Sequence, residues 1–135
     1  MNKLPNIVST TIPHRLQAYD TAGDYYSIED KAWIMYISES GDWRYDALVF
    51  IHEFVEMCLT KNNNVDWDKI TQFDTTGDGQ NHPDPGTLEN APYHNEHMSA
   101  TAIERLFAEM IGIDFDKYDE HLGNLEYPQL EVAHE

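Results

Sequence analysis

The segment WRYDALVFIHEFVEMCL, residues 43–59, decides how the rest of this 135-residue chain has to fold. Over residues 47–59 the only polar side chains are His52, Glu53 and Glu56. At about 100° per residue, these three lie within one arc of about 100° on a helix. A helix that is otherwise apolar has to be buried on nearly all sides. Three ionisable groups are therefore carried on a core helix that reaches water only along a narrow strip.

The pentapeptide His52-Glu53-Phe54-Val55-Glu56 is close to the zincin pattern, in which His-Glu-x-x-His on a helix binds zinc. Residues four apart share a helix face, so two ligands hold the metal while the intervening glutamate reaches the metal-bound water. Here Glu56 replaces the second histidine, and a carboxylate is also a zinc ligand. A metal would also offset the cost of burying these carboxylates. We predict His52 and Glu56 as metal ligands and Glu53 as the general base.

A second cluster, YHNEH at residues 93–97, opens another amphipathic helix and offers the third ligand. His97 is the preferred candidate because it borders the apolar stripe that should pack on the first helix. His94 is the alternative ligand. Glu104, two turns beyond His97, either orients an imidazole or binds the metal itself. Tyr93 is expected to stabilise an oxyanion.

Shorter patterns predict the remaining elements. Aromatic and β-branched residues predict a strand at 32–38, paired as a hairpin with Tyr25-Tyr26. A strand within 6–19 is expected to lie at an edge or to be interrupted by Pro13. Ser40-Gly41-Asp42 supplies a turn and an N-cap for the first helix. Further helices are expected at about 66–73, 94–111 and 114–118.

Two stretches predict irregular structure. Residues 74–92 contain three Gly and three Pro and predict a long functional or mobile loop, and the acidic tail 123–135 is expected to be loosely held. Asp74 and Asp78 match the start of a calcium-binding loop, but its twelfth position is Pro85, so these two residues and Asp84 are expected to form turns. We expect surface positions for His14, His82, His121 and His134, and core positions for Trp33, Trp43, Trp67 and Cys58.

The charge balance limits the classes of partner. Twenty-five acidic and eight basic residues give a formal charge of −17, which repels nucleic acid and anionic membranes and attracts cations or basic proteins. The single cysteine excludes a disulfide framework and a thiol-rich zinc site. The start of the chain lacks a signal-peptide pattern, and no stretch approaches the roughly 20 apolar residues of a membrane span, so a cytoplasmic protein is expected.

Several motifs together resemble a family of small phage and bacterial proteins that carry a His-Glu-x-x-Glu helix. They are GDWRY (41–45), HEFVE (52–56), Phe73-Asp74, PYHNEH (92–97) and AIE (102–104). The likeness covers about residues 12–120. It implies a minimal zincin-like metal-binding domain, in which a strand precedes the His-Glu helix and a second helix completes the site.

The sequence thus predicts one α+β domain over residues 1–135, zincin-like, with a small antiparallel sheet from the N-terminal third packed on two long helices and two short ones. The predicted function is zinc-dependent hydrolysis of a peptide or amide bond. A peptide or protein is the expected substrate or partner, adding as a strand beside residues 32–38. Two alternatives remain: a structural metal clip without activity, and an acidic effector that binds a host protein as a nucleic-acid mimic.

Overall fold

A computed structural model of the chain describes residues 5–29 and 31–128 and shows an α+β fold. A three-stranded sheet is made of β1 (Asn6–Ile12), β2 (Gly23–Ile28) and β3 (Ala32–Ser38), in the order β1-β3-β2. The predicted hairpin is confirmed, because β2 and β3 pair antiparallel. The expectation of a purely antiparallel sheet is wrong, because β1 pairs parallel to β3.

The mixed sheet has a simple cause. After Pro13 the chain forms a short 3-10 turn, η1 (His14–Leu16), and reverses direction. β2 does not pair with β1, and the position of one strand is left open between them. The tight turn after β2 then places β3 in the gap, where its apolar residues are covered best. Since both edges of β3 are paired, β3 has no free edge for a substrate strand, and that expectation for residues 32–38 is wrong.

Four helices follow the sheet. Asp42 caps the first helix through its side chain, as predicted, by accepting the N–H of Arg44 at 2.9 Å. The third helix ends before Gly112, which has a φ of 73° that favours glycine. The helices are α1 (Trp43–Asn62), α2 (Trp67–Thr75), α3 (His94–Met110) and α4 (Phe115–Gly123), and a further 3-10 turn is η2 (Pro85–Thr87).

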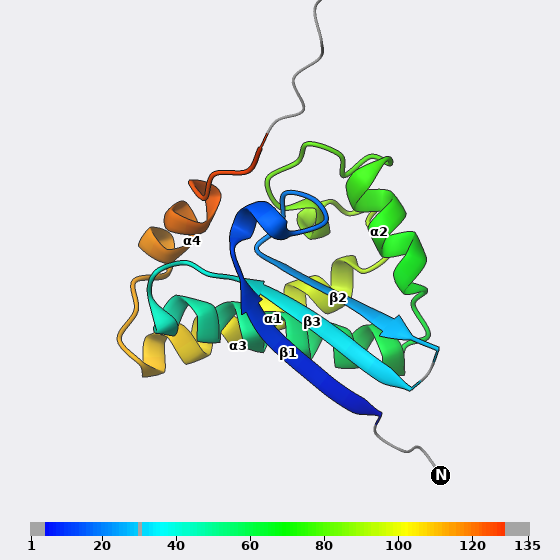
Figure 1. Ribbon diagram of the computed structural model, residues 1–135, viewed down its shortest axis with the longest axis horizontal. Coiled ribbons are helices and arrows are strands. Elements are labelled where there is room, and N and C mark those ends of the chain that lie inside the picture. The colour runs from blue at the N-terminus through cyan, green and yellow to red at the C-terminus, as the bar shows by residue number, and fades with distance from the viewer. Residues whose placement is uncertain (1–4, 30, 129–135) are drawn as a thin grey trace, which may run out of the picture.

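The molecule has layers in which α1 packs against one face of the sheet and α3 packs against α1 (Figure 1). Met35 and Ile37 of β3 meet Leu48 and Met57 of α1 in the core, and all four are at most 1% exposed. The burial of α1 is less complete than predicted. Trp43, expected in the core, is 74% exposed, because it occupies the first turn of α1 beyond the cover of the sheet.

The irregular segments make specific contacts. His14, expected on the surface, is buried and lies 2.8 Å from both Ser38 Oγ and Asp20 Oδ1. In the tail, the Tyr127 hydroxyl donates to the Gln17 carbonyl at 2.9 Å; His134 and residues 129–135 lie outside the described part of the chain. Residues 76–92 are irregular apart from η2. None of the helices described is long and apolar enough to cross a membrane.

Candidate metal centre

Three side chains from the two long helices converge in the interior between α1 and α3. His52 Nε2 lies 3.0 Å from Glu56 Oε2 and 3.2 Å from His97 Nδ1, and His97 Nδ1 lies 2.9 Å from Glu56 Oε2. A tetrahedral zinc ion with bonds of 2.0–2.1 Å needs ligand atoms about 3.3 Å apart. The three atoms therefore need to separate by only a few tenths of an ångström to hold zinc, and they are the predicted ligands.

The local helical geometry accounts for the first pair, and packing accounts for the third member. His52 and Glu56 are one turn apart on α1 and therefore point the same way. His97 is in the first turn of α3, where α3 crosses α1, and its ring meets the His52 ring edge-on at 4.7 Å between centroids. All three side chains are buried, with 8%, 4% and 8% of the residue surface exposed for His52, Glu56 and His97.

The hydrogen-bond donors and acceptors of this cluster indicate a position for a cation. His52 Nδ1 lies 2.9 Å from Glu104 Oε1, and a carboxylate only accepts, so Nδ1 carries a proton. In a neutral imidazole, Nε2 then presents a lone pair towards Glu56 Oε2, which is another acceptor. Two acceptors at 3.0 Å require a proton or a metal ion between them. The donor set of two imidazoles and a carboxylate fits zinc.

Without a metal, the neighbouring carboxylates favour the protonated form of both imidazoles. Burial alone would lower the pKa of His52, but its hydrogen bonds to Glu104 and Glu56 outweigh burial and raise the pKa well above 6.5. Burial likewise opposes the charge of His97, yet Asp84 and Glu56 raise its pKa to about 9. A proton or a metal ion thus supplies the positive charge that this site needs.

Glu56 is a carboxylate prepared for that charge. Burial alone would raise its pKa, but the imidazoles of His52 and His97 outweigh burial and lower the pKa to about 2. Its second oxygen, Oε1, accepts the Tyr25 hydroxyl of β2 at 2.8 Å. This bond fixes the carboxylate so that Oε2 faces the two imidazoles.

Glu104 orients His52 and is not placed as a ligand. It contacts Nδ1, the nitrogen that faces away from Glu56, and its other oxygen accepts a short hydrogen bond from the Tyr118 hydroxyl of α4. Histidines that bind metals commonly donate their second nitrogen to a carboxylate in this way. Of the two roles that the sequence left open for Glu104, the geometry favours the orienting one.

His97 has a similar neighbour in the loop before α3. Its Nε2 lies 2.9 Å from Asp84 Oδ1, at ion-pair distance but outside hydrogen-bond alignment. Behind the ring lies Gly86 of η2, where a Cβ atom would be only 2.3 Å from the Cγ atom of His97. The loop at 84–86 therefore fixes His97 from outside the ligand set.

Glu53 lies beside the cluster on the same helix. Its side chain covers Gly23 at the start of β2, where a Cβ atom would be 2.4 Å from the Cγ atom of Glu53. Burial and the neighbouring Glu56 raise the pKa of Glu53 to about 8. Among the described residues none forms a hydrogen bond with its carboxyl group. A carboxyl group without such a hydrogen bond is available as an acid or a base, which is the role that the sequence predicts for Glu53.

The other two residues that the sequence predicts for the site, His94 and Tyr93, make contacts outside the cluster. His94 Nδ1 lies 3.0 Å from the Gly86 carbonyl oxygen, and among the described residues His94 is not part of the group that could hold a metal ion. The Tyr93 hydroxyl donates to Asp74 Oδ1 at 2.7 Å, so its proton is not free for an oxyanion. Asp74, expected only to form a turn, also accepts the Tyr19 hydroxyl at 3.2 Å.

Sequence patterns did not identify the residues that surround the ligands. Tyr25 belongs to the Tyr25-Tyr26 pair of the predicted hairpin, Tyr118 ends a predicted short helix, and Asp84 belongs to a loop rich in turn-forming residues. One available signal was Gly86 between Pro85 and the YHNEH cluster, because a glycine near a ligand often marks close packing. All of these residues reach the site through tertiary contacts.

Comparison with known proteins adds no family to this description. The chain matches no protein-family model, no curated protein and no solved structure. The resemblance to small phage and bacterial proteins with a His-Glu-x-x-Glu helix accordingly stays a prediction.

Proposed function

We propose that this chain is a zinc-dependent hydrolase of peptide or amide bonds, with the metal held by His52, Glu56 and His97. The observation that carries the proposal is the convergence of their three ligand atoms within 3.2 Å of one another, directly beside Glu53. Three protein ligands with an open fourth position are typical of catalytic zinc, whereas structural sites have four. Glu104 contacts the outer nitrogen of His52 and so does not supply a fourth.

The roles of the side chains follow from their positions. A bound zinc ion supplies Lewis acidity and activates a water molecule near neutral pH. Glu53 would take a proton from that water and return it to the leaving amine. Its pKa of about 8 in the metal-free protein means that it must first lose its own proton, which a cation bound beside it would favour. Glu104 and Asp84 hold the imidazoles in orientation. Tyr93 has no role in this proposal, because its hydroxyl is donated to Asp74.

Metal content tests the site itself. Protein purified without added metal should contain about one zinc ion per chain by mass spectrometry. His52→Ala should lose it, and His121→Ala, a change of a histidine on α4 that contacts the Ser40 carbonyl oxygen and no proposed ligand, should keep it. A folded wild type that holds no metal and takes up none would refute the proposal.

The reaction needs a separate test. Glu53→Gln retains the size of the side chain and touches no ligand, so it should keep the zinc and lose at least about a hundredfold in turnover of a quenched fluorogenic peptide mixture. An unchanged rate in Glu53→Gln would remove Glu53 from the mechanism.

A structural metal clip is a second candidate, and the burial of the ligands favours it. Only 4–8% of each ligand residue is exposed, which restricts the approach of a large substrate. If zinc serves only to join α1 and α3, its removal should lower the melting temperature, while the zinc-loaded protein should cleave no peptide. Peptide cleavage that Glu53→Gln abolishes would exclude the purely structural role.

A further inference from the structure

The strand β1 has an open edge that lacks the usual protection against pairing. β1 pairs only with β3 in the described sheet, and its sequence NIVSTTI contains no charged residue, Gly or Pro. Natural edge strands are normally interrupted by charges, proline or bulges, because an open edge recruits another strand. In a chain of charge −17, seven consecutive uncharged residues on an edge strand are a specific feature.

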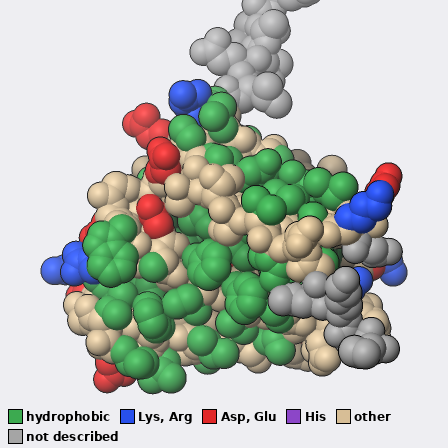
Figure 2. All heavy atoms as spheres, turned by 60° about the horizontal axis from the view of Figure 1, so that its bottom comes forward, with side chains coloured by type: hydrophobic (Ala, Val, Ile, Leu, Met, Phe, Trp, Pro, Cys, Tyr) green, Lys and Arg blue, Asp and Glu red, His purple; other side chains and the backbone are tan. Residues whose placement is uncertain are grey.

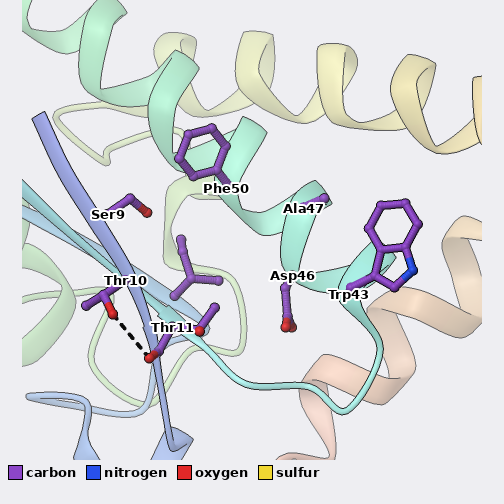
Figure 3. Close-up of a pocket in the computed structure, with 8 residues that line it drawn as sticks. Ser9, Thr10, Thr11, Trp43, Asp46, Ala47 and Phe50 are labelled. Atoms are coloured by element: carbon purple, nitrogen blue, oxygen red, sulfur yellow. Dashed lines mark hydrogen bonds between the residues drawn. The ribbon is translucent and has the colours of Figure 1, made fainter.

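A groove runs along the same edge, on the helix side of the sheet. It has a volume of about 440 Å³ and is formed by β1 on one side and α1 on the other (Figure 3). The register places Ser9 beside Met35 and Thr11 beside Ile37, so both small side chains face the helices, as Met35 and Ile37 do. The groove exists because α1 extends over the position next to β1, where the sheet has no strand.

The helices continue this surface as an apolar face. Trp43 and Phe50 of α1 are 74% and 39% exposed, and Ile103, Leu106 and Met110 of α3 are 45%, 60% and 71% exposed. At 100° per residue, those three residues of α3 share one flank. Figure 2 shows a face of the molecule on which hydrophobic side chains gather, with most of the Lys, Arg, Asp and Glu side chains towards its margins.

We propose that a second copy of this chain docks on this face, with its β1 pairing antiparallel to β1 across a two-fold axis. Such pairing closes two open edges at once and extends the sheet over the groove. The five exposed side chains amount to roughly 650 Å² of surface, which is close to the about 800 Å² per partner of a standard stable interface.

The charge distribution favours a second copy over a basic partner. Among the described residues that line the groove, only Asp46 is charged, and its Oδ1 accepts the Ser40 N–H at 3.0 Å and the Ser40 hydroxyl at 2.6 Å. A basic protein would therefore find a single carboxylate in an otherwise uncharged groove. Two copies of this chain would bring together uncharged surfaces while their acidic surfaces repel from a distance. Salt screens that repulsion, so dimerisation should strengthen as ionic strength rises.

The test is sedimentation equilibrium of the full chain over a concentration series, with matched substitutions on the two edge strands. Wild type should be a dimer. Its dissociation constant should decrease when the NaCl concentration is raised from 50 to 500 mM. Ser9→Lys on β1 should raise that constant at least about a hundredfold by placing like charges across the two-fold pair. Ser27→Lys, an equally exposed serine on the other edge strand β2, should leave it unchanged.

Further outcomes decide the proposal. Met110→Lys changes a side chain that is 71% exposed, so the fold should be preserved, and this variant should also be monomeric if Ser9→Lys proves unstable. A wild type that stays monomeric, or a dimer that survives both substitutions, would overturn the proposal. Dimers that weaken with salt would point to a charged interface instead. The proposed interface lies on the side of α1 opposite to His52. The zinc content of the Ser9→Lys, Ser27→Lys and Met110→Lys proteins should therefore equal that of the wild type.

Discussion

Replacing Gly86 by alanine should damage the metal centre without altering any ligand. A Cβ atom at this position would lie 2.3 Å from His97 Cγ, 2.6 Å from its Nδ1 and 2.7 Å from its Cδ2. Non-bonded heavy atoms prefer a separation of about 3.6 Å. The imidazole or the loop must therefore move by about 1.3 Å. Because Gly86 has an ordinary negative φ, the effect comes from this overlap and not from backbone strain.

The size of that displacement sets the expected loss of affinity. Zinc–ligand distances tolerate errors of about 0.2 Å, so a shift of about 1 Å removes His97 from the coordination sphere or strains η2 to keep it there. We expect the dissociation constant for zinc to rise about a hundredfold or more, which corresponds to about 3 kcal/mol. The metal-free protein should lose about 1–3 kcal/mol of unfolding free energy from the overpacking.

Competition with a chromophoric zinc chelator measures the affinity, and thermal unfolding of the metal-free protein measures the stability. Gly123→Ala is the matched control, because a Cβ atom there meets nothing within 4 Å and Gly123 lies in the last turn of α4. A Gly86→Ala protein that binds zinc within twofold of wild type would refute the reasoning, as would an equal loss of affinity in Gly123→Ala.

Three further predictions concern the same centre. Gly23→Ala would place a Cβ atom 2.4 Å from Glu53 Cγ, so peptide turnover should fall at least about tenfold while the metal content by mass spectrometry stays at wild-type level. Glu104→Gln leaves His52 with a weaker partner, and its zinc affinity in the chelator assay should drop by about 10- to 100-fold; an unchanged value would assign Glu104 no part in the site. The pKa of His97 is about 9 in the metal-free protein, so zinc must displace a proton below that pH. Affinity should therefore rise as the pH increases from 6 towards 9, and a flat profile over this range in buffered titrations would contradict protonation of His97.

The same pKa shift predicts a pH dependence of folding. The folded-state pKa of His97 is raised from 6.5 to about 9, so the folded protein binds this proton more tightly than the unfolded chain. The contribution to stability is complete below about pH 6.5 and is lost as the pH rises through about 9. Urea denaturation of the metal-free protein should show this loss, and saturating zinc should remove it. A metal-free protein that is equally stable at pH 6.5 and pH 9.5 would contradict this reasoning.

The proposed dimer interface and the metal centre occupy different sides of α1. Phe50 and His52 are separated by about 200° around the helix axis, so one side supplies the exposed apolar face and the other supplies ligands. This division explains why α1 is apolar almost all round although it is not completely buried. On this flank, Trp43, Ala47 and Phe50 line the groove beside β1.

The sequence by itself determined the local parts of this protein. The cap at Asp42, the start of α1, the hairpin of β2 and β3, and the common face of His52 and Glu56 follow from interactions within a few residues. Even the choice of His97 depended on a local pattern, because a histidine at the border of an apolar stripe has to face the neighbouring helix. These features are set by helix periodicity and turn chemistry.

Only the tertiary structure decided what is built from distant segments. The parallel pairing of β1 with β3 depends on where the chain returns after Pro13, and no local pattern encodes that. The bond from Glu104 to the outer nitrogen of His52 joins residues 52 positions apart, and the contact of Gly86 with His97 depends on how a loop closes over α3. The physical reason is that periodicity fixes the direction of a side chain, whereas packing between elements fixes which group it meets and at what distance.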